Sequence, residues 1–142
     1  MRIMALDFGA KTVGVAVTDP LMITIQGVEV IRREHENKLR KTLARIEELI
    51  REYSVDMIVL GLPLNMDGSM SERASKSEEF ADKIRRRTGL EVKLHDERLT
   101  SVEAEERMRS AGIPFAERKL MVDMVAAEVI LEDYLNTYGA AL

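Results

Sequence analysis

The first third of the chain contains short apolar runs that are separated by turns. Residues 3–6 and 13–17 are apolar and flank a segment that contains Gly9, a pattern that predicts two strands joined by a tight hairpin turn. Gly9 and Gly14 are expected to supply the backbone freedom that such a turn needs. The segment 23–31 is rich in β-branched residues and predicts a third strand.

The remainder of the chain alternates between helical and strand patterns. Apolar residues recur at helical spacing from about residue 34 to 53, which makes this helix the clearest element. After it we expect a buried parallel strand over 56–61, a helix over 72–87, a strand over 91–97, and helices over about 100–110 and 116–138. Thr100 and Glu103 form a capping-box pair that is expected to start the first of these last two helices.

Together these elements predict an α/β fold. Three antiparallel strands come first and parallel strands follow, so we expect a five-stranded mixed sheet that is flanked by helices. No repeat, low-complexity segment or linker interrupts the chain, and 142 residues suit one domain. Residues 1–142 are therefore predicted to form a single domain.

The composition excludes several classes of protein. The longest uncharged apolar stretch, residues 57–66, is far shorter than the roughly 20 residues that span a bilayer. The chain has no cysteine, so disulfides and thiolate metal sites are excluded. The N-terminus lacks the pattern of a signal peptide. We therefore expect no membrane association and a cytoplasmic location.

Charge argues against a protein that coats nucleic acid through its overall field, because the net charge is -4. Short basic clusters nevertheless occur at residues 32–33, 38–41, 85–87 and 118–119. Our interpretation is that each is an ordinary solvated face, with phosphate contact as the alternative. His35 and His95 are also expected at the surface.

Two carboxylates occupy positions where burial is expected. Asp7 ends a strand that is apolar on both faces, and a buried carboxylate costs several kcal/mol unless a partner or a metal compensates. Asp123 falls on the apolar stripe of the last predicted helix, in line with Leu120 and the small residues 126–127. The plainer alternative for Asp123 is an ion pair with an arginine at the edge of the core. Glu128 and Glu132 lie away from this stripe and are expected to face solvent.

A third acid follows the strand predicted over 91–97. Functional groups gather beyond the carboxyl ends of parallel strands, and both Asp96 and Glu97 have this placement. The residue pattern leaves these two open. Three carboxylates without cysteine would form a hard oxygen site that suits Mg²⁺ or Mn²⁺, and such sites often cleave phosphodiesters with two ions.

Four motifs in this order resemble those of the YqgF family, also called RuvX, of Holliday-junction resolvases and pre-16S rRNA nucleases. They are Asp7-Phe-Gly9 with Gly14-Val-Ala-Val17, Gly61 to Gly68, Asp96 to Ala104, and Lys119 to Leu131. The resemblance covers nearly the whole chain. It departs at Thr12, where many relatives have arginine, at Met22, where many have glycine, and after Ser69.

The resemblance implies a ribonuclease H-like fold and an acidic divalent-metal site. By position, Asp7, Glu97 and Asp123 would be both its catalytic residues and its metal ligands, which selects Glu97 over Asp96. The expected cofactor is Mg²⁺ or Mn²⁺, with two ions. The candidate substrate-binding residues are Lys11, Asn65, Arg98 and Lys119.

The function expected from these residues is a metal-dependent endonuclease on structured nucleic acid, which matures the 5′ end of pre-16S rRNA. A Holliday-junction resolvase is the alternative, and a non-catalytic RNA-binding or ribosome-assembly module is another. The partners would be precursor rRNA or branched DNA and ribosomal precursor particles, with the chain a monomer or a homodimer. Asp7-Phe-Gly9 also resembles the first phosphate loop of actin-like ATPases and sugar kinases, which bind nucleotide between two such domains.

Overall fold

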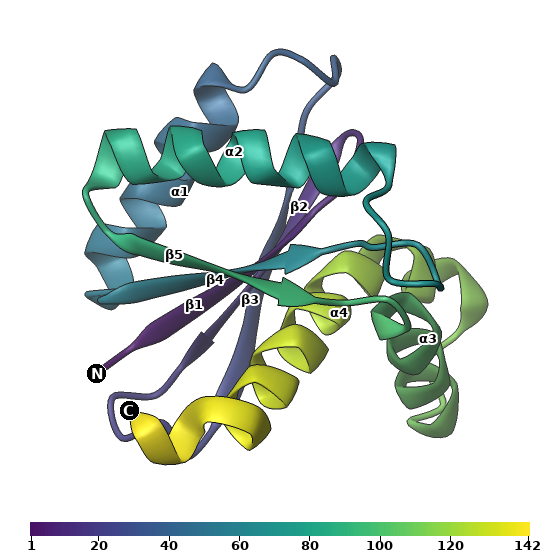
Figure 1. The fold of residues 1–142 in the computed structure, drawn as a ribbon. Helices are drawn as coiled ribbons and strands as arrows, with labels where there is room; N and C mark the ends of the chain where they lie inside the picture. The colour runs from purple at the N-terminus through teal and green to yellow at the C-terminus, as the bar shows by residue number, and fades with distance from the viewer.

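A five-stranded mixed sheet lies at the centre of the computed structural model, which describes all 142 residues (Figure 1). The strands are β1 (Ile3–Phe8), β2 (Thr12–Thr18), β3 (Ile25–Arg32), β4 (Met57–Leu62) and β5 (Glu91–Asp96). Their order in the sheet is β3-β2-β1-β4-β5. β2 is antiparallel to both of its neighbours, whereas β4 is parallel to β1 and to β5. The predicted mixed sheet is thereby confirmed.

Helices cover both faces of the sheet. They are α1 (Arg40–Tyr53), α2 (Glu72–Thr88), α3 (Thr100–Ser110) and α4 (Phe115–Tyr138), with a final 3₁₀ turn, η1 (Gly139–Ala141). α1 and α2 pack on one face and α4 crosses the other, while α3 packs on α4 (Figure 1). Because β1, β4 and β5 are parallel, their carboxyl ends lie at the same edge of the sheet.

Two element boundaries differ from the sequence prediction for local reasons. β3 begins at residue 25 because the Asp19 carboxylate accepts hydrogen bonds from the backbone N–H groups of Leu21, Ile23 and Thr24 and holds them in a loop. α1 begins at residue 40, six residues after the predicted start. Glu36 in the preceding loop is held by ion pairs from α2, so the helix does not extend back through it.

The starts of the last two helices also correct the prediction. The expected capping box is not formed: α3 has no side-chain cap, and Glu103 pairs with Arg107 instead. Leu120, which the helical stripe places on the inner face, is 61% exposed because the first turns of α4 extend past the sheet.

No helix combines the length and the apolar character that crossing a membrane requires.

Two glycines on the sheet allow α4 to approach it closely. A Cβ atom on Gly14 of β2 would overlap the backbone carbonyl of Asp123, and one on Gly27 of β3 would lie 2.5 Å from a Glu128 oxygen. Neither Gly9 nor Gly14 has a positive φ, so the prediction that both supply special turn conformations is wrong. The role of Gly14 is to bring the helix, and with it Asp123, onto the sheet.

Candidate active site

Three carboxylates from three different elements meet at one edge of the sheet. Asp7 lies near the end of β1, Glu97 directly follows β5, and Asp123 lies on α4. Gly14 is the partner of Asp7 in the β1–β2 register and is also the residue on which α4 rests at Asp123. The antiparallel pairing and the helix crossing together place Asp123 beside Asp7.

Glu97 reaches the site across the adjacent strand. A Cβ atom on Gly61 of β4 would lie 2.5 Å from the Glu97 Cδ atom, so only glycine at this position leaves room for the carboxylate. The neighbouring Asp96 is exposed and pairs with Arg98 at 2.9 Å. The structure thus brings Glu97, and not Asp96, to Asp7.

Burial raises the pKa values of both Asp7 and Glu97. Burial, together with the nearby charge of Asp123, raises the pKa of Asp7 to about 7, although a hydrogen bond from Glu97 acts to lower it. Burial raises the pKa of Glu97 to about 9, with the charge of Asp7 and the hydrogen bond to it acting in the same direction. Glu97 is therefore the more readily protonated of the two acids near neutral pH.

Asp123 is oriented by a side chain of the hairpin. The Thr12 Oγ1 atom donates a 2.5 Å hydrogen bond to Asp123 Oδ2. Thr12 is the first residue of β2. Asp7 and the hydroxyl group that orients Asp123 therefore lie on either side of the short β1–β2 turn. The predicted alternative, an ion pair between Asp123 and an arginine, is not observed.

Two arginines support the turn between β1 and β2 from the α1–α2 side. Arg33 donates to the carbonyl oxygens of Gly9 at 2.7 Å and Ala10 at 2.8 Å. Arg73 of α2 donates to the Phe8 carbonyl at 3.2 Å, and its charge lowers the pKa of Asp7. Both guanidinium groups lie over the Phe8 ring, so this turn is held firmly next to the acids.

The donor set fits a hard divalent cation. It consists of carboxylate oxygens only, and the raised pKa values of Asp7 and Glu97 leave the site with a proton that a cation would displace. The three acids do not already form a closed ligand cage, because Asp7 and Glu97 contact each other and Asp123 is turned toward Thr12. Small rotations of these side chains would release them for a shared ion.

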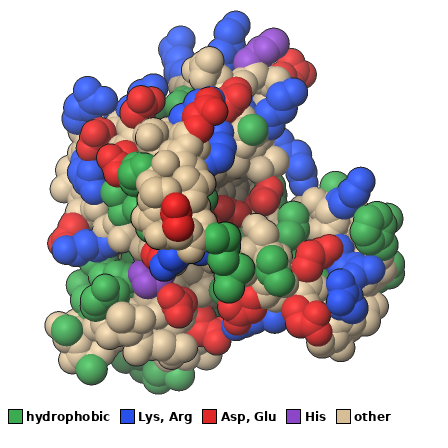
Figure 2. All heavy atoms as spheres, turned by 45° about the vertical axis from the view of Figure 1, so that its right-hand side comes forward, with side chains coloured by type: hydrophobic (Ala, Val, Ile, Leu, Met, Phe, Trp, Pro, Cys, Tyr) green, Lys and Arg blue, Asp and Glu red, His purple; other side chains and the backbone are tan.

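The four candidate substrate-binding residues divide into two pairs. Lys11, in the β1–β2 turn, and Lys119, in the first turns of α4, are exposed and make no ion pair. Asn65 and Arg98 instead hold the loop that follows β4: Asn65 donates to Ser69, and Arg98 donates to the Met66 carbonyl at 3.0 Å. Figure 2 shows a hollow with acidic side chains in its floor and basic side chains above it.

Three residues expected at the surface are more engaged than the sequence indicates. The His95 side chain is only 11% exposed and contacts Asp133. Glu128 is half-buried over Gly27, and burial raises its pKa. Glu132 pairs with Arg107 of α3. The helical period shows which residues share a face of α4. It does not reveal that α3 and β3 pack beside the face that carries Glu128 and Glu132.

The sequence matches the family described as "RuvX: Holliday junction resolvase" over residues 1–137. The chain belongs to the RuvX family. A protein of Agathobacter rectalis named "Putative pre-16S rRNA nuclease" is 58% identical over 136 residues, which cover 96% of this chain and 95% of the relative. A protein of the same name from Streptococcus pyogenes is 46% identical over 137 residues, 96% of this chain and 98% of the relative.

Solved structures of Holliday junction resolvases share the fold of this RuvX protein. Thermus thermophilus RuvC in complex with a Holliday junction substrate aligns over 99% of this chain and 96% of that chain, with a TM-score of 0.62 and 11% identity. The fowlpox virus Holliday junction resolvase aligns over the full length of both chains, with a TM-score of 0.58 and 16% identity. The expected ribonuclease H-like fold and the expected family are confirmed.

Sequence reasoning misses several residues that build the site. Thr12 stands out only as a departure from relatives, and its position at the start of a strand carries no signal of its contact with Asp123. Arg33 and Arg73 lie on separate elements, and no spacing links them to the hairpin. Gly61 belongs to a quoted motif, but its role in admitting Glu97 follows only from the β4–β5 pairing.

Proposed function

We propose that this RuvX protein is a divalent-metal-dependent nuclease that hydrolyses phosphodiester bonds of structured nucleic acid. One observation carries the proposal: Asp7, Glu97 and Asp123 meet at one sheet edge, where burial and mutual repulsion raise the pKa values of the first two. A site that concentrates negative charge in this way is costly without a cation. The nuclease names of the family and of its relatives support the same function.

Asp7, Glu97 and Asp123 would hold the metal, and Mg²⁺ or Mn²⁺ suits their oxygens. Bound there, divalent cations would lower the pKa of an attacking water and stabilise the charge of the phosphoryl group. The chain's own residues would orient the site: Thr12 fixes one oxygen of Asp123, and Gly61 leaves Glu97 free to turn. Glu97 would have to give up its proton before it acts as a ligand.

The favoured substrate is the 5′ end of pre-16S rRNA. The supporting observation is that relatives 58% and 46% identical carry the name of a pre-16S rRNA nuclease. We place this activity in the cytoplasm, on ribosomal precursor particles. A chain that cuts one RNA strand can act as a monomer.

The second candidate is resolution of four-way DNA junctions, which the description of the family as Holliday junction resolvases favours. Symmetric cleavage of a junction requires two active sites, so this function predicts a homodimer. Sedimentation that shows only monomer at assay concentrations would count against it.

The test is a cleavage assay on a labelled pre-16S rRNA 5′ end and a labelled four-way junction, each with Mg²⁺, with Mn²⁺ and with chelator. The proposal expects metal-dependent cleavage that Asp7→Asn abolishes while the fold is retained. Glu78→Gln is the matched control, because Glu78 is exposed, makes no ion pair and carries the same charge. Full activity in folded Asp7→Asn would overturn the site, and cleavage of only one substrate would decide between the two functions.

A further inference from the structure

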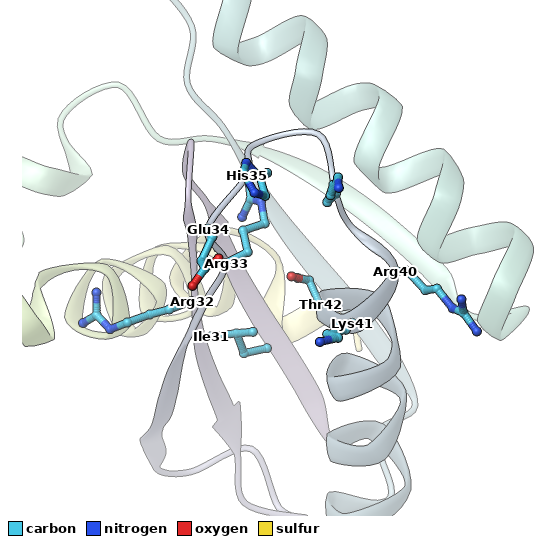
Figure 3. A pocket seen from close by; sticks show the side chains of 9 residues that line it. Ile31, Arg32, Arg33, Glu34, His35, Arg40, Lys41 and Thr42 are labelled. Carbon is cyan, nitrogen blue, oxygen red and sulfur yellow. The ribbon is translucent and has the colours of Figure 1, made fainter.

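A pocket of about 670 Å³ lies between the end of β3 and the start of α1, on the α1 side of the sheet. We call it the basic groove, and it is lined by Ile31, Arg32, Arg33, Glu34, His35, Lys38, Arg40, Lys41 and Thr42. Five of these side chains are lysine or arginine, one is histidine, and a single glutamate opposes them. In Figure 3, Lys41 and Thr42 extend from α1 on the side of β3, whereas Arg40 points outward.

None of the five lysines and arginines of the basic groove makes an ion pair, and what distinguishes them from the other unpaired cations of the chain is that they gather around one pocket. Lys38, Arg40 and Lys41 make no ion pair, whereas nine other lysines and arginines do: Arg45, Arg73, Lys76, Arg85, Arg87, Lys93, Arg98, Arg107 and Arg109. The clustering of five unpaired cations gives this pocket a local positive field in a protein whose net charge is -4.

The helix that borders the basic groove adds to this field. α1 has no side-chain cap and no acid in its first turn, although Arg40 and Lys41 lie there. The N-terminal end of a helix is already positive, so basic residues in this position disfavour the helix. α2, α3 and α4 each have an acid in the first turn. An anion bound in the groove would offset the unfavourable charge of the basic residues at the start of α1.

Hydrogen bonds connect residues of the basic groove to the segments that carry Asp7 and Asp123. The Arg33 backbone N–H donates to the Lys11 carbonyl at 2.9 Å, and its side chain holds the Gly9 and Ala10 carbonyls. Arg32 donates to the Leu120 carbonyl of α4, three residues before Asp123. The exposed, unpaired Lys11 lies in the turn that joins the groove to the acids.

We propose that the basic groove binds the phosphate backbone of a second segment of the substrate nucleic acid, away from the bond that is cut. This inference rests on the proposed function for the identity of its substrate. Exposed cations beside the positive end of a helix suit phosphate groups. Contacts of this kind carry no base specificity. The groove therefore supplies affinity and places an arm of the nucleic acid, and duplex RNA and duplex DNA share the chemistry that it recognises.

The test measures binding in chelator, where no cleavage occurs, by fluorescence anisotropy with labelled duplex RNA, duplex DNA and a four-way junction. The double variant Lys38→Ala/Lys41→Ala removes two exposed, unpaired charges of the groove. The matched control is Arg51→Ala/Arg86→Ala, which removes two exposed arginines without ion pairs from the last turns of α1 and α2, at the opposite edge of the sheet.

We expect the groove variant to bind about 10- to 30-fold more weakly at low salt. Its salt dependence, as the slope of log K against log[salt], should fall by about 1 to 2. Its Tm should not fall, because the removed charge opposes the helix dipole. The control should bind as the wild type does. The nucleic acid for which the groove variant loses more affinity is the preferred source of the phosphates, RNA or DNA.

Unchanged affinity of the groove variant for all three nucleic acids, or an equal loss in the control, would overturn the inference. Because the assay contains no metal, its result is separate from that of the cleavage assay. Cleavage that depends on Asp7 together with unchanged groove binding would reject the groove alone. Groove-dependent binding without any cleavage would reject the proposed nuclease and keep the groove.

Discussion

Replacement of Asp7 by asparagine should stabilise the metal-free protein while it removes activity. Burial and the Asp123 charge together raise the pKa of Asp7 from 3.8 to about 7. At about 1.4 kcal/mol per pH unit, this corresponds to about 4 kcal/mol at alkaline pH. The buried amide of the variant side chain would cost part of this gain, so we expect the free energy of unfolding at pH 8 to rise by about 1 to 3 kcal/mol.

The pH dependence gives the sign of this effect. A carboxyl whose pKa is raised in the folded state binds its proton more tightly there than in the unfolded state, so stability falls as pH rises through the folded pKa. The gain from Asp7→Asn should therefore be small at pH 4, below the folded pKa, and full at pH 8. Thermal melts in chelator at both pH values should show a Tm higher by about 3–9 °C at pH 8 only. A Tm that is unchanged or lower at pH 8, beside an unaffected Glu78→Gln control, would refute the reasoning.

The remaining predictions concern the residues that shape the site. Gly61→Ala should leave the Tm within a few degrees of wild type, because the atoms it meets are the flexible end of Glu97, yet cleavage should fall at least about tenfold. Gly14→Ala meets the backbone of α4 at Asp123 and should destabilise the fold by about 3 kcal/mol in urea unfolding, and a wild-type midpoint would contradict this close packing. Thr12→Val keeps the shape and removes the hydroxyl donor to Asp123, so cleavage should fall by roughly 10- to 100-fold, with Thr12→Ser as the control that retains it.

Much of the fold is predictable because it depends on local pattern. The apolar runs correctly predict β1, β2 and β4, and the helix predicted over 72–87 is observed as α2, which Gly89 ends in the left-handed conformation. The position of Asp7 near the end of a buried strand is also predicted correctly. These features depend on residues that are close in sequence, so periodicity and turn chemistry reveal them.

The features that sequence does not reveal depend on contacts between distant elements. The residue pattern alone leaves Asp96 and Glu97 equivalent; the family resemblance selects Glu97, and the space above Gly61 supplies the physical reason. Glu36 shortens α1 through ion pairs with α2, which no local spacing indicates. The basic clusters at 32–33 and 38–41 each have the pattern of a solvated face, and only the fold brings them into one groove.

The most direct test of the central claim is a calorimetric titration of the protein with Mn²⁺ at pH 7.5. We expect binding that is lost or weakened at least about tenfold in Asp7→Asn, Glu97→Gln and Asp123→Asn, and retained in Glu78→Gln. Titrations in two buffers of different ionisation enthalpy should also show proton release, because Glu97 holds a proton at this pH. Wild-type Mn²⁺ affinity in all three carboxylate variants would contradict the account.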